Sequence, residues 1–110
     1  MKRITKQAWS RVHEKALEIA NAAMRDDFVM AEVYTQHLLE LLTELDEAFG
    51  PQAVLLATRA DFLKVPAERL KLYEAALALA REQGDREEEV EILDSLRVMS
   101  EEQASESQDE

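Results

Sequence analysis

The residues that most often end a helix, glycine and proline, are confined to three places in this 110-residue chain. Gly50 and Pro51 are adjacent, Pro66 stands alone, and Gly84 is the second glycine. Glycine suits the position that closes a helix, and proline suits the first helical turn but not the interior. The long stretches between these residues therefore favour helices. Two glycines cannot supply the tight turns of an all-β domain or a phosphate-binding loop.

Composition favours the same fold class. The chain has sixteen Ala and fifteen Leu, which are strong helix formers, but only seven Val and three Ile, which are typical of strands. There is no cysteine and there are only two histidines, which excludes a disulfide framework and a Cys/His zinc site. We therefore expect an all-α protein.

Charge is distributed unevenly along the chain. The formal net charge is −11, with +4 over residues 1–25, −5 over residues 26–81 and −10 over residues 82–110. Such an acidic chain repels nucleic acid, which is bound by neutralising its phosphates. The acidic excess is either a solvated surface or a face that attracts a basic partner.

No apolar run approaches the roughly 20 residues that span a bilayer, so we expect no membrane partner. The basic N-terminal segment has no apolar segment after it of the kind found in signal peptides. A cytoplasmic location is the expectation.

Apolar residues recur at helical spacing over five stretches, 9–23, 28–49, 51–64, 66–83 and 86–101. The second stretch places Phe28 on its apolar side, and the fifth places Val90 and Leu93 in an apolar stripe. We expect one helical domain over 1–101 and a disordered acidic tail over 102–110, where apolar residues are nearly absent. Short connections make neighbouring helices antiparallel. Two architectures remain open: stacked helical hairpins with a closing helix, and a closed five-helix bundle.

An internal repeat connects the second and fourth helices at an offset of 38 residues, which aligns Leu39 with Leu77. The second helix of tetratricopeptide repeats has aromatic, alanine and leucine positions at fixed spacing. The chain resembles this pattern at two sets of residues, Asp27, Phe28, Ala31 and Leu39 in one unit and Tyr73, Ala76 and Leu77 in the next. The resemblance implies about two and a half repeats, with the last helix as a polar cap.

The resemblance also implies a concave groove lined by the first helix of each pair. Asn21 and Arg25, with Thr58 and Asp61, would then face a partner peptide or helix. Thr58 and Asp61 differ from the Lys, Asn and Arg set with which some family members hold a C-terminal carboxylate. A basic or apolar segment is therefore the expected ligand, and the acidic residues Glu87, Glu88 and Glu91 are candidates at one rim.

No pattern of catalytic or cofactor-binding residues stands out. His13 and His37 lie 24 residues apart, without the Glu-x-x-His spacing of di-iron bundles. The run Glu87–Glu89 suits the first turn of a helix, where acidic side chains are favourable. We therefore expect no enzyme activity, no cofactor and no metal.

Two functions from different classes fit the sequence. One is a small adaptor or scaffold that binds another protein in a helical groove. The other is an acidic inhibitor of immunity or antitoxin type that binds a basic protein. A homodimer through the leucine-rich second helix is a further alternative.

Overall fold

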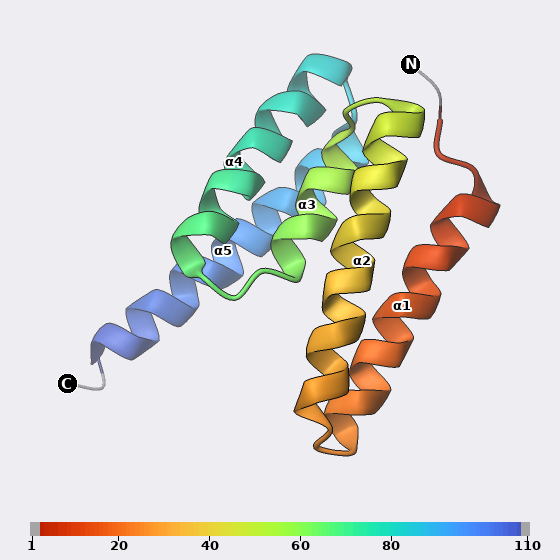
Figure 1. Cartoon of the computed structure of the whole chain (residues 1–110). Helices are drawn as coiled ribbons and strands as arrows, with labels where there is room; N and C mark the ends of the chain where they lie inside the picture. The colour runs from red at the N-terminus through yellow and green to blue at the C-terminus, as the bar shows by residue number, and fades with distance from the viewer. Residues whose placement is uncertain (1–2, 109–110) are drawn as a thin grey trace. The chain divides into compact units, whose positions relative to one another are not determined.

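The computed structural model describes residues 3–108, and side chains as far as Ala104. It is all-α, as expected, and the described residues contain no strand. None of the described helices combines the length and apolar character needed to cross a bilayer. The five helices are α1 (Lys6–Met24), α2 (Phe28–Phe49), α3 (Ala53–Asp61), α4 (Pro66–Gln83) and α5 (Arg86–Gln108) (Figure 1).

Side-chain caps begin three of these helices. The carboxylate of Asp27 accepts a hydrogen bond from the Met30 amide at 3.2 Å, and Asp85 accepts one from the Glu88 amide at the same distance. The hydroxyl of Thr5 caps α1 in the same way. Each cap satisfies an amide that the first helical turn leaves without a partner. Gly84 ends α4 in the left-handed conformation, at φ +69°, which confirms its predicted role.

Two helices differ in length from the sequence prediction. The third was expected over 51–64, but α3 begins after Gln52, which is extended, and ends at Asp61. Residues 62–64 form the connection to Pro66 instead. The fifth was expected to end at 101, yet α5 continues to Gln108, through part of the predicted disordered tail, because no glycine or proline interrupts it. Residues 109–110 lie outside the described part.

Contacts divide the chain into two compact units, Met1–Pro51 and Gln52–Glu110, where the sequence suggested one domain over 1–101. The first unit is an antiparallel hairpin in which α1 packs along α2 (Figure 1). The buried side chains of α1 are Val12 and Ala22. Those of α2 are four leucines that recur at helical spacing: Leu38, Leu41, Leu42 and Leu45.

The second unit is built around α4, which contacts both α3 and α5, and α3 and α5 also contact each other (Figure 1). Its core is dominated by small residues of α3 and α4, with a few larger side chains from α4 and α5. The buried set is Ala53, Ala57, Ala60, Tyr73, Ala76, Ala80, Ile92 and Met99. Because alanine adds almost no thickness, α3 and α4 can approach closely, and Tyr73 fills the remaining space.

Three apolar residues lie on the opposite side from the one that periodicity predicted. Phe28, expected on the apolar side of α2, is 67% exposed. On α5, Val90 and Leu93 are exposed, whereas Ile92 and Met99 face the core. Both stripes of α5 have helical spacing, and packing against α4 selects the one that is buried.

The alanine-rich contact makes a testable prediction about stability. Ala76 is completely buried, so Ala76→Leu forces extra methylene groups into a close helix contact and should lower the free energy of unfolding by about 1–3 kcal/mol. Ala78→Leu is the matched control, because Ala78 is exposed on the same helix and helix propensity changes equally. Urea unfolding followed by circular dichroism measures both. Equal stability of the two variants would contradict close packing at Ala76.

Candidate functional site

The predicted groove residues are divided between the two units. Asn21 is exposed on α1, and Arg25 is the exposed residue that ends this helix. Thr58 and Asp61 lie on α3, in the second unit. The Thr58 hydroxyl donates to the Val54 carbonyl of its own helix at 2.7 Å. No single unit therefore contains all four residues.

Asp61 is part of a hydrogen-bonded group that joins the end of α3 to the start of α4. The buried Tyr73 hydroxyl donates to the Asp61 carboxylate and accepts from the Arg69 guanidinium, with the Arg69 bond 3.4 Å long. Arg69 also donates to the carbonyl of Ala60 at 3.2 Å. Burial, followed by the hydrogen bond to Asp61, raises the pKa of Tyr73 above its usual value. Asp61 therefore takes part in the hydrogen bonds that link α3 to α4.

The acidic residues predicted at the rim do gather in the second unit. Burial of Glu88 and, after it, the negative charges of Glu91, Asp85, Asp61 and Glu87 together raise the pKa of this half-buried carboxyl to about 7. This group, the acidic cluster, therefore brings Asp61 of α3 into electrostatic contact with three predicted rim residues of α5. Burial together with these charges lets Glu88 hold a proton near neutral pH.

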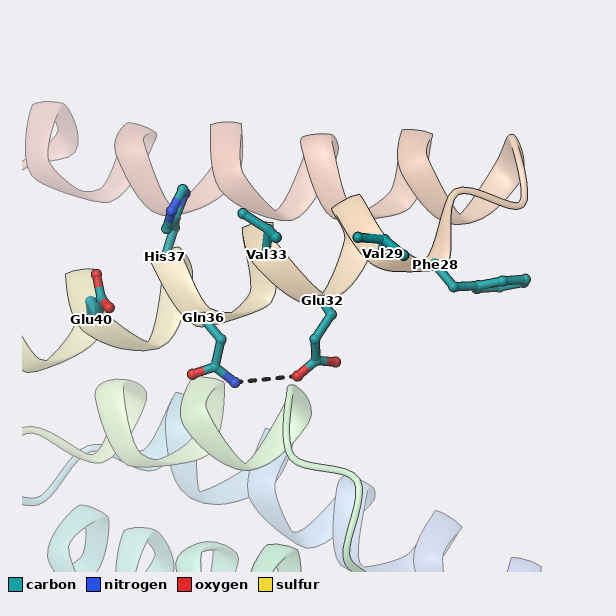
Figure 2. A pocket seen from close by; sticks show the side chains of 7 residues that line it. All are labelled: Phe28, Val29, Glu32, Val33, Gln36, His37 and Glu40. Atoms are coloured by element: carbon teal, nitrogen blue, oxygen red, sulfur yellow. Dashed lines mark hydrogen bonds between the residues drawn. The ribbon is translucent and has the colours of Figure 1, made fainter.

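The surface that the sequence analysis missed is the outer face of α2. A shallow hollow runs along it, lined by Phe28, Val29, Glu32, Val33, Gln36, His37 and Glu40. Figure 2 shows Val29, Val33 and His37 in one row along the helix. Glu32 and Gln36 form a neighbouring row, in which the Gln36 amide donates to the Glu32 carboxylate at 3.3 Å.

This outer face exposes three apolar side chains among its polar ones, on a helix surface that is normally polar throughout. Val29 is 75% exposed, Phe28 67% and Val33 37%, and helical geometry places Val29 and Val33 opposite the buried leucines. The sequence did contain a signal for it, since Val29 and Val33 are four residues apart and outside the leucine spacing. That signal was hidden because α2 has apolar residues on two sides.

The histidines take part in aromatic contacts. His37 lies edge-on to Tyr34 with ring centroids 6.5 Å apart, and His13 lies edge-on to Trp9 at 6.0 Å. Within residues 3–108, no group of three His, Asp or Glu side chains is arranged to hold a metal ion. The hollow on α2 includes no member of the acidic cluster.

No known protein family, curated protein or solved structure matches this chain.

The Tyr73 hydroxyl should contribute measurably to stability. Tyr73→Phe removes its bonds to Asp61 and Arg69 while keeping the ring, so the free energy of unfolding should fall by about 1 kcal/mol. Tyr34→Phe is the control, because no hydrogen bond of the Tyr34 hydroxyl is present among the described residues. Chemical denaturation compares the two variants. A loss no larger for Tyr73→Phe than for Tyr34→Phe would show that these bonds contribute nothing net.

Glu88 should make stability depend on pH. The folded protein protonates Glu88 with a pKa of about 7, against 4.5 without these neighbours, so the folded state binds the proton more tightly. The free energy of unfolding should therefore decrease as pH rises from about 4.5 to about 7, and this contribution should then stay constant. Because Glu88 is half-exposed and partly screened by water, we expect a decrease on the order of 1 kcal/mol.

Glu88→Gln should remove this decrease and make the protein more stable than the wild type at pH 8, as measured by unfolding at several pH values. Glu82→Gln, on the exposed surface of α4, should leave the pH profile unchanged. Identical profiles for wild type and Glu88→Gln would argue against a raised pKa at this position.

Proposed function

We propose that this chain is a small, non-catalytic protein-interaction module, an adaptor or scaffold that acts in the cytoplasm. The observation that carries the proposal is the exposed apolar row on the outer face of α2, formed by Val29 and Val33 with Phe28 next to them. Contiguous apolar surface on a soluble helix commonly marks a protein-binding site. Burying such side chains against a partner supplies most of the affinity in helix-mediated recognition.

The antiparallel hairpins support a relationship to tetratricopeptide repeats, which we keep as part of the proposal. In both units one helix packs against its chain neighbour through small or apolar residues, as the α3–α4 alanines illustrate. On this view Asn21, Arg25 and Thr58 are additional partner-facing residues, while Asp61 is engaged with Tyr73. Their contribution to binding is secondary to that of the α2 face.

A second function, an acidic inhibitor that binds a basic protein, is favoured by the acidic cluster. Glu91, Asp61 and Glu87 lie close enough to Glu88 for their charges to add to the effect of burial in raising its pKa. A cationic partner near these carboxylates would relieve that repulsion and associate faster at low salt. The two functions predict different binding residues, on α2 for the adaptor and on α5 for the inhibitor.

Substitution on α2 distinguishes them. In affinity capture from cells that express the chain, the double variant Val29→Glu, Val33→Glu should reduce the recovery of a specific partner by at least about tenfold, because it places charge on the apolar row. Val90→Glu is the matched control, since Val90 is 66% exposed on α5. Chemical cross-linking with peptide mapping then locates the contact.

Capture that depends on Glu87, Glu88 and Glu91 but not on Val29 and Val33 would favour the inhibitor instead. Capture that depends on neither set would contradict both functions.

A further inference from the structure

The outer face of α2 has two chemically different halves. Towards its start the apolar Phe28, Val29 and Val33 are exposed, beside Glu32 and Gln36, which are hydrogen-bonded to each other. Towards its end helical spacing continues the same face through Glu40, Glu44 and Glu47. A ligand that covers the whole face meets apolar side chains at one end and carboxylates at the other.

The charge of α2 restricts what can bind there. The helix has five acidic residues and no Lys or Arg. The Arg11 guanidinium of α1 approaches the Glu44 carboxylate at 3.7 Å, but both side chains are more than half exposed, so water screens this pair. The negative half of the face therefore favours a cationic ligand.

A second copy of the chain fits this face poorly. In a symmetric dimer with parallel α2 helices, carboxylates would oppose each other. In an antiparallel dimer, each acidic half would lie against the apolar half of the second copy without a cation to pair with, and each chain has a net charge of −11. Like charges that oppose each other at an interface are destabilising. Charge complementarity thus selects a basic partner over a homodimer.

The length of the face indicates the size of the ligand. Val29 and Glu47 are 18 residues apart on one helix, which corresponds to roughly 27 Å at the rise of an α-helix. A partner helix of about five turns covers this distance and presents side chains at matching intervals.

We propose that the outer face of α2 binds an amphipathic helix of a partner protein, about five turns long, with apolar residues at one end of its binding face and Lys or Arg at the other. The apolar end covers Val29 and Val33, and the basic end lies over Glu40 and Glu47. This inference rests on the proposed adaptor function and specifies the chemistry of the partner.

Synthetic helix-forming peptides of about 18 residues test the inference directly. The first has leucines in one half of its face and lysines in the other. The second replaces the lysines with glutamates, and the third has the composition of the first in scrambled order. Isothermal titration with the full chain should give the tightest binding for the first peptide, by about tenfold over each of the others.

Paired variants separate the two halves of the face. Val29→Glu with Val33→Glu should weaken the lysine peptide by at least about tenfold, and Glu40→Gln with Glu47→Gln should weaken it about threefold and reduce its salt dependence. Val90→Glu and Glu82→Gln are the matched controls and should change nothing. Circular dichroism checks that each variant is folded. If the glutamate pair unfolds the hairpin, Val29→Ser with Val33→Ser replaces it.

Three outcomes would overturn the inference. One is equal binding of the lysine and glutamate peptides. Another is binding of the lysine peptide that is unchanged by both pairs of substitutions on α2. The third is a concentration-dependent dimer that Val29→Glu with Val33→Glu abolishes, which would show that a second copy covers the face. The capture of a partner can also require Val29 and Val33 even though the segment that contacts them is not a basic helix. That result would refute this inference and leave the adaptor function intact.

Discussion

The close contact between α3 and α4 determines most of what the second unit can do. Ala57, Ala60 and Ala76 leave no side-chain bulk between the two helices, so their backbones can approach. That approach lets the Tyr73 hydroxyl reach Asp61 and lets Arg69 reach the last turn of α3. With Asp61 held in place, its charge adds to those that raise the pKa of Glu88 on α5. Alanine packing thus positions one of the charges in the acidic cluster, while burial of Glu88 has the largest effect on its pKa.

The first unit has a different physical basis. Its helix α2 buries a leucine-rich side, with Leu38 and Leu42 almost completely covered, and leaves a second apolar row exposed on the opposite side. While the leucines face α1, Val29 lies on the side of α2 away from it and is 75% exposed, and Val33 beside it is 37% exposed. The exposed surface of these valines is not removed from water by the hairpin, so it is available for contacts outside it.

The sequence predicted helix number, order and several boundaries because these depend on local chemistry. Asp27 and Asp85 cap the helices that follow them directly in the sequence, and Gly84 ends the preceding helix through its left-handed backbone conformation. The end of α5 was placed too early because a low apolar content was interpreted as disorder, although Glu, Gln and Ala sustain a helix without a core. Which stripe of α5 is buried depends on α4, and periodicity alone contains no information about that choice. The candidate site was predicted only in part because tertiary packing decides which side of a helix is exposed. The acidic residues of α5 could be identified from their charge alone. The apolar row of α2 could not, because finding it requires knowing which side of α2 faces α1.

The charged surfaces and the apolar surface of this chain would have different roles in the proposed binding reaction. Long-range attraction depends on net charge, and the acidic cluster on α5 together with the acidic half of α2 attracts any cationic partner during encounter. Such attraction mainly changes the association rate and is weakened by salt. The exposed apolar row of α2 acts only at contact, by removing Val29 and Val33 from water, and so mainly changes the dissociation rate. A partner with both cationic and apolar residues therefore benefits at both stages. A purely basic partner would bind quickly but dissociate quickly, so under the proposed function the α2 face, rather than the acidic excess, would determine specificity.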